Sequence, residues 1–525
     1  MTPPMPRKFL NAVLPSLRRG LALAGLPFAC GALSAQQANA PLLTRRDGIA
    51  ALDYEVIPVQ GGPSLDLMGF HYLKPLNGWL YLGVGGHAPV LKGDYGGFMA
   101  FDATLHIQKK LAGNLFADGG LSVGGGGGGK SIHQSAILSG SGHYLKKYIG
   151  LGYDFRALSV GLNYTGFQFT HSAIHHSQFD VYLQMPFSFS LGPYGHAGDR
   201  WLSLPRAEAD DLFADAGESM FTQSLEHLSQ IKPAGTNKRP IDVFELQFSH
   251  FLGRDWYFYA EGGAGYHGLP AYNQVLGGIG YRVHLNPRFN LYAQVAAGSG
   301  GYAPSVVDTG PGLLVYPKVA AEYALDRNWG VALSGGYLFA PRGTSRNAVL
   351  GASLYFHPFS TRMDPMEGGG SDDVEFQDRR LNVFVQSDLD PTVGGKRRGS
   401  VSLLTAQYDT VLGRHWYLPV QVGVAFLGYP GYGEVLVGVG AQTPDRPGAS
   451  CQGFAQILVG ANLFGLIAKP EVGVLWGLGP HATLRLSSGK TLSLDDARSA
   501  EYPSDHRFQS TTAGLGLSYR FSLPN

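Results

Sequence analysis

Residues 511–521, TTAGLGLSYRF, lie near the end of the chain and show the alternation that decides the fold class. Successive side chains of an extended strand point to opposite faces. One face of this stretch is wholly apolar and comprises Leu515, Leu517, Tyr519 and Phe521. The opposite face is small, polar or charged and comprises Gly516, Ser518 and Arg520. The stretch is therefore predicted to be a strand that separates an apolar environment from a polar one.

The composition extends this prediction to the whole chain. Of 525 residues, 75 are glycine and only 15% are charged, whereas soluble proteins commonly have ~7% glycine and ~25% charged residues. No run of 18 or more apolar residues follows the first 40 residues, so membrane-spanning helices are not expected. Low charge and 12% aromatic residues favour strands with one face toward lipid and the other toward a polar interior.

The closing stretch resembles the last strand of bacterial outer-membrane β-barrel proteins, which ends on an aromatic residue. Gly516, Tyr519 and Phe521 match that pattern, whereas Gly514 stands where a polar residue belongs. No particular family among these barrels is indicated. The resemblance implies a porin-like barrel in the outer membrane of a Gram-negative envelope. It also implies contact with the lipid bilayer and insertion by the outer-membrane assembly machinery through the C-terminal strand.

Residues 1–40 are predicted to be a signal peptide, which would direct export to the outer membrane. Basic residues precede the apolar stretch 21–33, and Ala38-Asn39-Ala40 supplies a small-residue cleavage pattern. Without its four basic residues the mature chain has 36 Lys and Arg against 39 Asp and Glu, a charge that does not suit nucleic-acid binding. Cys451 is then the one remaining cysteine, which excludes an intramolecular disulfide.

Three blocks of related sequence occupy residues 50–195, 240–360 and 395–525. Trp79, Trp256 and Trp416 occur at the same place in successive blocks, and we expect them in an aromatic girdle at the membrane interface. Alternation predicts about seven strands in each block.

These strands predict an all-β fold. Their total is taken to be even, because outer-membrane barrels usually have even strand numbers. The expected architecture is one large transmembrane antiparallel β-barrel of about 22 strands over residues 41–525. It would be built from three related seven-stranded units. The closing strand would then pair with residues 65–73.

Two segments depart from the strand pattern. Residues 205–231 have helical periodicity, a proline suited to the first turn and acidic residues in the N-terminal half. They predict a helical connector between blocks, or a plug folded into the lumen. Residues 361–380 are acidic and rich in glycine, which predicts a flexible solvated loop.

Two motifs carry possible chemistry, and neither predicts a site. Residues 124–131 match the sequence pattern of a phosphate-binding loop. The motif requires a helix after the loop, and none is expected here. His171, His175 and His176 have a spacing that can hold a metal, yet exposed loop histidines are the simpler interpretation. No compact Ser-His-acid pattern is present, so no catalytic residue, metal site or cofactor is predicted.

Charged residues on polar strand faces are the remaining candidates. They are expected to face the lumen, and they are Glu261, Arg282, Lys318, Glu322, Lys469, Glu471, Arg485 and Arg520. In a pore such charges would influence which solutes pass. In a closed barrel they would form ion pairs that fill the interior.

Three functions follow from these observations. The first is a pore or passage for an unidentified solute or polymer across the outer membrane. The second is a structural or interaction protein of the envelope, made of tandem small β-barrels. The third is a barrel hydrolase that acts on lipid, which would need a serine, a histidine and an acid on the outer wall.

Overall fold

The computed structural model describes residues 43–128, 142–192, 202–205, 218–232, 235–270, 272–303, 305–358, 373–429, 431–444, 451–479, 481–494 and 507–524. The predicted signal peptide at 1–40 lies outside these ranges. All regular elements within them are strands. No helix among these residues has the length and apolar character needed to cross a membrane.

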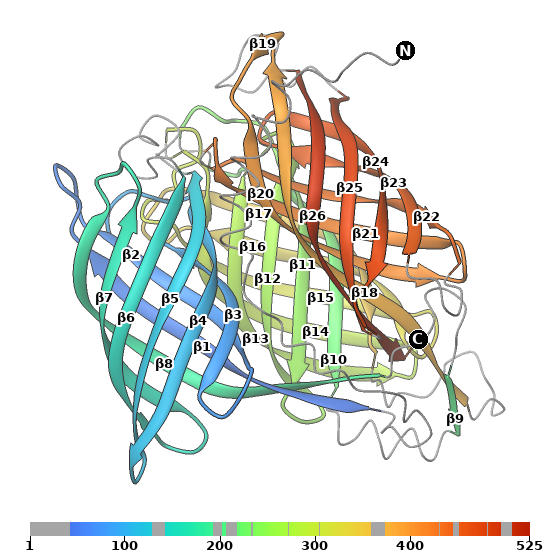
Figure 1. The fold of residues 1–525 in the computed structure, drawn as a ribbon, viewed down its shortest axis with the longest axis horizontal. Helices are drawn as coiled ribbons and strands as arrows, with labels where there is room; N and C mark the ends of the chain where they lie inside the picture. The colour runs from blue at the N-terminus through green and yellow to red at the C-terminus, as the bar shows by residue number, and fades with distance from the viewer. Residues whose placement is uncertain are drawn as a thin grey trace, which may run out of the picture.

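The strands close into three separate antiparallel barrels of eight strands each, which stand side by side in Figure 1. Barrel 1 comprises β1 (Thr44–Ile57), β2 (Leu65–Pro75), β3 (Leu80–Ala88), β4 (Phe98–Ala112), β5 (Leu115–Gly128), β6 (His143–Asp154), β7 (Ser159–Phe169) and β8 (His175–Leu191). Barrel 2 comprises β10 (Ser219–Leu228), β11 (Ile241–Phe251), β12 (Trp256–His267), β13 (Asn273–Asn286), β14 (Phe289–Gly301), β15 (Leu313–Ala324), β16 (Trp329–Phe339) and β17 (Arg346–Phe356).

Barrel 3 closes through pairing of its first and last strands, β18 and β26. It comprises β18 (Asp373–Val393), β20 (Val401–Leu412), β21 (Trp416–Leu427), β22 (Gly433–Gln442), β23 (Cys451–Asn462), β24 (Gly465–Gly477), β25 (Ala482–Ser493) and β26 (Phe508–Pro524). Two short strands, β9 (Leu202–Pro205) and β19 (Lys396–Arg397), pair with β18 outside this circuit.

The prediction of antiparallel barrel strands is confirmed, but the single barrel of about 22 strands and the seven-stranded units are wrong. The seven strands predicted in each block lie within one barrel and leave out that barrel's first strand, which is β1, β10 or β18. With this strand the number is eight, and an even number lets the first and last strands pair antiparallel and close on themselves. Each block together with its first strand therefore forms a complete barrel.

The predicted helical connector at 205–231 is also wrong in its described part. Residues 219–228 form β10, which pairs with β11 on one side and with β17 on the other. Met220, Thr222 and Glu226 are buried inside the barrel, whereas Leu225 is exposed on its outer face. Apolar residues therefore lie on both faces, and the Leu225–Leu228 spacing imitates a helical stripe.

The predicted flexible loop at 361–380 needs a similar correction. Residues 361–372 lie outside the described ranges, but 373–380 belong to β18. Arg379 and Arg380 are buried there, where β18 pairs with β26. The closing strand therefore meets β18 and β25, whereas residues 65–73 of β2 pair with β1 and β3.

The outer faces of all three barrels are apolar. Leucine, isoleucine, valine and phenylalanine side chains point outward along most strands, and Phe179, Leu333 and Val472 have exposed fractions of 66%, 71% and 60%. Burial alternates strictly along β11, and along β14 from Phe289 to Gly298. Water would strongly disfavour so much exposed apolar surface, whereas lipid accommodates it.

The barrels are joined at both ends. At the loop end, which carries the longer connections 89–97 and 302–312, the amide of Gly96 donates to the carbonyl of Gly310, 3.0 Å away. The Ser299 hydroxyl donates to the Pro89 carbonyl across 2.6 Å. At the turn end, which carries the short turns 76–79, 252–255 and 413–415, one apolar cluster draws on all three barrels. It contains Leu191, Phe356, Phe376 and Phe521.

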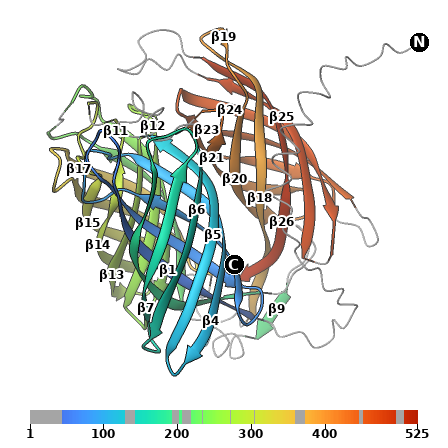
Figure 2. The same cartoon turned by 60° about the vertical axis from the view of Figure 1, so that its left-hand side comes forward.

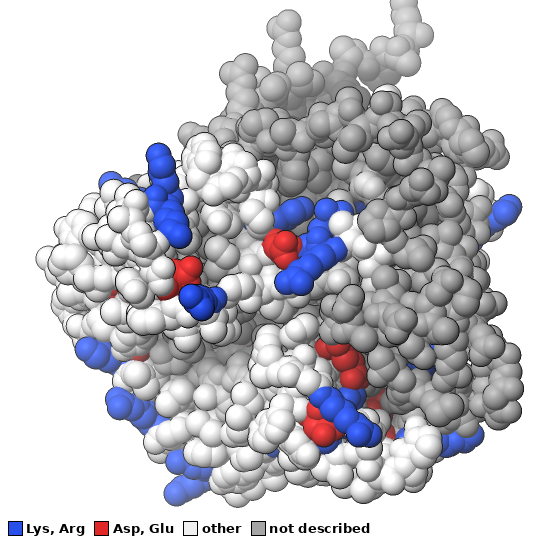
Figure 3. All heavy atoms as spheres, turned by 90° about the horizontal axis from the view of Figure 1, so that it is seen from below, with Lys and Arg blue, Asp and Glu red and all other residues white. Residues whose placement is uncertain are grey.

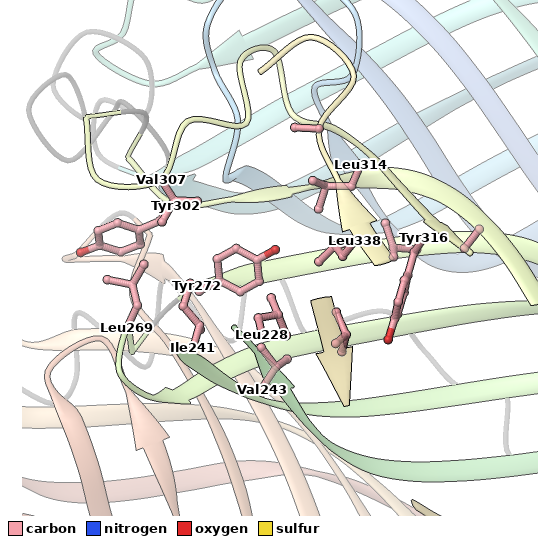
Figure 4. Packing of buried hydrophobic residues seen from close by; sticks show 14 of the residues in the cluster. Leu228, Ile241, Val243, Leu269, Tyr272, Tyr302, Val307, Leu314, Tyr316 and Leu338 are labelled. Atoms are coloured by element: carbon pink, nitrogen blue, oxygen red, sulfur yellow. The ribbon is translucent and has the colours of Figure 1, made fainter. Parts of the chain in front are cut away.

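A larger apolar cluster links barrels 2 and 3 at the loop end. Within barrel 2, Leu228, Tyr272 and Leu338 converge between the strands (Figure 4). The same cluster continues through Tyr432 and Phe464 of barrel 3. Figure 2 shows the three barrels in contact from a second direction. The chain thus forms one assembly of three barrels.

Candidate functional site

Each barrel holds a buried lysine on its sixth strand: Lys146 on β6, Lys318 on β15 and Lys469 on β24. Strand alternation brings these side chains inward. On β6, for example, Lys146 faces the lumen while Leu145 and Lys147 on either side point outward. A buried ammonium needs carboxylate or other polar partners, because removal from water costs several kcal/mol.

In barrel 1 the Lys146 ammonium reaches across the lumen to carboxylates of β1 and β8. Its Nζ lies 2.6 Å from Asp53 Oδ2, 3.1 Å from Glu55 Oε1 and 3.8 Å from Asp180 Oδ2. All four groups are nearly excluded from solvent. This cluster connects three strands through one cation.

In barrel 2, Lys318 makes the same kind of connection to three glutamates on consecutive strands. Its Nζ lies 3.0 Å from Glu245 on β11, 3.1 Å from Glu261 on β12 and 3.4 Å from Glu226 on β10. Tyr316 donates a hydrogen bond of 3.0 Å to Glu226. The predicted residues Glu261 and Lys318 therefore lie together.

In barrel 3, the Lys469 ammonium contacts the Glu434 carboxylate and the Gln386 amide oxygen. The Glu471 carboxylate pairs with Arg485 over 3.0 Å. The predicted residues Lys469, Glu471 and Arg485 thus fill the lumen of barrel 3.

The other three predicted charges are also buried inside barrels. Arg282 pairs with Glu218 in barrel 2 and donates through Nη2 over 2.7 Å. Glu322 accepts from the Tyr292 hydroxyl at 2.8 Å. Arg520 of barrel 3 donates to Gln452 at 2.9 Å. All eight predicted residues are at most 7% exposed, and they bond to other interior groups.

Apolar residues close the lumen of barrel 1 at the loop end, beyond the ion pairs. In barrel 1 the closure contains Ile57, Leu67, Phe98, Phe167 and Phe169. A polar cavity below it, beside Asp53, His106 and Lys146, has a volume of about 40 Å³. That space holds a few water molecules, so the interior is packed with side chains, as eight-stranded barrels generally are.

Sequence reasoning missed the interior charges of barrel 1, above all Asp53, Glu55 and Lys146. The alternation of Asp53 and Glu55 with Leu52 and Tyr54 was available as an indication. This indication was missed because the first strand expected in this block, residues 65–73, begins after Glu55. Lys146 was missed because Lys147 follows it directly. Two adjacent lysines on a strand face opposite sides, and the sequence alone did not show which of them faces the lumen.

The predicted interface tryptophans, Trp79, Trp256 and Trp416, are all more than half exposed on the outer side of the short turns. Among the closing-strand positions, Phe521 is buried in the turn-end cluster and packs with Tyr519. Gly516 pairs with Phe384 and Arg485 on the two neighbouring strands. Their roles in the membrane and in assembly remain predictions.

The two motifs with possible chemistry take ordinary structural places. The glycines at 124–128 are the end of β5, and residues 129–131 lie outside the described ranges. His175 and His176 are exposed at the start of β8. Neither they nor His171 belongs to a group of three metal-ligand side chains among the described residues.

A serine and a histidine do meet outside the lumen of barrel 2. The Ser219 hydroxyl lies 3.2 Å from His250 Nδ1. His250 also packs against Phe187 of barrel 1, so the pair is covered by the neighbouring barrel. In the described residues no ion pair joins a carboxylate to His250, and the pair does not form a hydrolase triad.

Closed antiparallel barrels with apolar exteriors and polar interiors define a class, the outer-membrane β-barrel proteins. The resemblance found in the sequence is confirmed at that level, and the apolar exteriors agree with the predicted localisation. No protein-family model and no curated protein sequence matches the chain.

Solved structures similar to the chain include siderophore receptors and a porin. The ferric enterobactin receptor PfeA of Pseudomonas aeruginosa in complex with BCV-L6 has 11% identity and a TM-score of 0.28, covering 93% of this chain and 82% of its own. The siderophore receptor PirA of Acinetobacter baumannii has 9% identity and a TM-score of 0.28, covering 91% and 81%. The NanC porin has 9% identity and a TM-score of 0.17, covering 57% and 98%. Likeness at these scores carries no inference about function.

Proposed function

We propose that this chain is a structural or interaction protein of the outer membrane, in which three small closed barrels form one rigid platform. The observation that carries the proposal is the filling of the lumens. Each barrel has a buried lysine bonded across its interior, and barrel 1 also has an apolar closure at the loop end.

An open pore is the competing function. Opening a lumen would require separating several buried ion pairs, and removing one partner from a buried pair costs roughly 3–5 kcal/mol. The polar cavity of about 40 Å³ in barrel 1 is too small for a sugar or peptide. The filled interiors therefore favour an interaction role over passage of a solute.

The surfaces available to a partner lie at the two ends of the barrels, which project from the membrane. Seen from the turn end in Figure 3, Lys and Arg side chains are spread over the visible surface with a few Asp and Glu among them. The loop end carries the longer connections, which in outer-membrane barrels face the cell exterior. We place the interaction surface on these loops, and assembly through β26 remains part of this proposal.

Planar lipid bilayers test the choice between platform and pore. The purified full-length chain, with its fold checked by heat-modified gel migration, is expected to give no discrete conductance steps. A matched preparation of a known open porin is the positive control. Regular steps from the folded chain would overturn the platform proposal and support passage of a solute.

A further inference from the structure

The lumen of barrel 1 contains two imidazoles between two carboxylates, a combination absent from the buried lysine clusters of the other barrels. His71 lies on β2, His87 on β3 and Asp102 on β4, which are neighbouring strands, and Asp53 lies on β1. All four are buried. Three neighbouring strands thus bring two ring nitrogens and one carboxylate to one point.

The geometry gives the two carboxylates different positions relative to the rings. On one side, His71 Nε2 is 3.2 Å from both oxygens of Asp102, and His87 Nε2 is 3.4 Å from Asp102 Oδ2. On the other side, Asp53 lies 3.5 Å from His71 Nδ1 and 3.9 Å from His87 Nδ1. Both rings therefore direct Nε2 to Asp102 and Nδ1 toward Asp53.

His87 has no hydrogen-bond partner at either ring nitrogen within the described part of the chain. Its side chain is 0% exposed, and a buried polar group without a partner is costly. The nearest carboxylate oxygens to its two ring nitrogens lie 3.4 and 3.9 Å away and make no well-formed hydrogen bond with them.

Asp102 is held in place but lacks a strong cation. Its oxygens accept hydrogen bonds from Thr104 at 2.6 Å and from Tyr144 at 2.5 Å. Among the described residues, no Lys or Arg forms an ion pair with it, whereas Lys146 takes the Asp53 side of the cluster. A carboxylate without a lysine or arginine partner therefore remains only on the Asp102 side.

We propose that His71 Nε2, His87 Nε2 and the Asp102 carboxylate bind a divalent transition-metal ion such as Zn²⁺. Two ligand atoms that each lie ~2.0–2.1 Å from a tetrahedral ion are roughly 3.3–3.4 Å apart. The distances of 3.2 and 3.4 Å from Asp102 to the two rings agree with this spacing. Asp53, 3.5 Å from His71 Nδ1, then stands where a second carboxylate orients a histidine ligand in metal sites.

The other two barrels act as internal comparisons. Asp102 pairs with a glycine of the third strand, Gly85, and Gln274 and Glu434 pair with third-strand glycines in the same way. Along the same register, the positions of His71 and His87 are occupied by Glu245 and Gly265 in barrel 2, and by Thr405 and Ala425 in barrel 3. Imidazoles at these two register positions are therefore specific to barrel 1.

The experiment measures metal bound to the folded full-length chain. The protein is stripped with a chelator in detergent micelles and then dialysed against buffer containing Zn²⁺, and bound zinc is counted by mass spectrometry. We expect one zinc per chain in the unmodified protein and at least a tenfold loss of affinity in His71→Gln and His87→Gln. Co²⁺ in place of Zn²⁺ is expected to give the intense visible absorption of a tetrahedral site.

His106→Gln is the matched control, because His106 is a buried histidine of the same lumen whose Nδ1 lies 2.8 Å from the Tyr148 hydroxyl. It should bind zinc as the unmodified protein does. A combined His171→Ala, His175→Ala and His176→Ala variant removes exposed loop histidines and should also keep the zinc.

Three results would overturn the proposal. They are unchanged binding in His87→Gln, an equal loss in His106→Gln, and loss of the zinc with the loop histidines. If His87→Gln does not fold, the unmodified protein still decides, because no bound zinc or an octahedral Co²⁺ spectrum would also overturn the proposal.

Discussion

Lys318 shows at the scale of one residue how a filled barrel is held together. One ammonium on β15 bonds to three glutamates on β10, β11 and β12, on the far side of the lumen. No other lysine or arginine within the described residues forms an ion pair with these glutamates. The group therefore depends on a single cation, and its loss would leave three buried carboxylates to repel one another.

Replacement of that cation is the first prediction. We expect Lys318→Met to lower the free energy of unfolding by roughly 3–5 kcal/mol, the usual cost of breaking a buried ion pair. Urea unfolding of the refolded chain in detergent micelles, followed by tryptophan fluorescence, measures the change. Lys238→Met is the control, because Lys238 is exposed in the connection before β11.

A second variant distinguishes the lost charge from the lost packing. Lys318→Met combined with Glu245→Gln and Glu261→Gln removes the cation together with two of the three buried carboxylates that it neutralises. We expect this variant to recover at least half of the lost stability. A cost below ~1 kcal/mol for Lys318→Met alone would contradict the role assigned to the cluster.

At the scale of one element, β10 shows how a strand can carry a helical pattern. Its lumen face needs small and polar side chains, here Thr222, Ser224 and Glu226, and its outer face includes Phe221 and Leu225. Pairing with β11 and β17 satisfies the backbone of the strand on both edges. A helix in this place would leave the facing edges of β11 and β17 unpaired in lipid, where each unpaired backbone group costs several kcal/mol.

A charge on the outer face of β10 tests this placement. We expect Leu225→Arg to destabilise the protein in lipid vesicles by about 2–4 kcal/mol, as arginine does near the bilayer midplane. Leu76→Arg, in the short turn before β3, should cost ~0–1 kcal/mol because it lies near the interface. Denaturant titration in vesicles measures both, and equal costs would place Leu225 away from the lipid.

At the scale of the whole molecule, the junctions between the barrels decide whether the chain is one body or three. Gly96, in the 89–97 connection of barrel 1, packs directly on the 302–312 connection of barrel 2. A Cβ at Gly96 would meet the hydroxyl of Thr309 and would lie 2.9 Å from the carbonyl oxygen of Gly310. Only a residue without a side chain allows this approach.

Gly96→Ala is therefore expected to separate the two connections while leaving the barrels closed. The expected result is at least tenfold faster cleavage of these connections by a protease added to the loop end, with unchanged heat-modified gel migration. Gly78→Ala is the matched control, since a Cβ there meets no atom within 4 Å. Equal cleavage of the two variants would mean that the junction does not depend on this contact.

The sequence by itself determined the class of element and the side on which each charge lies. Period-two alternation predicts that Lys318, Glu471 and Arg485 face inward, and the structure buries all three. This was possible because the two faces of a strand are set by neighbouring residues alone. The same local rule would have found Asp53 and Glu55 had the first strand been recognised.

Only the tertiary structure decided how many barrels there are and which charges meet. The edges of different strands expose the same N–H and C=O groups, so nothing local tells β26 to pair with β18 and not with β2. That choice depends on closure between strands distant in the sequence. The same closure brings Lys146 of β6 to Asp53 of β1, because a lumen exists only once its first and last strands have paired.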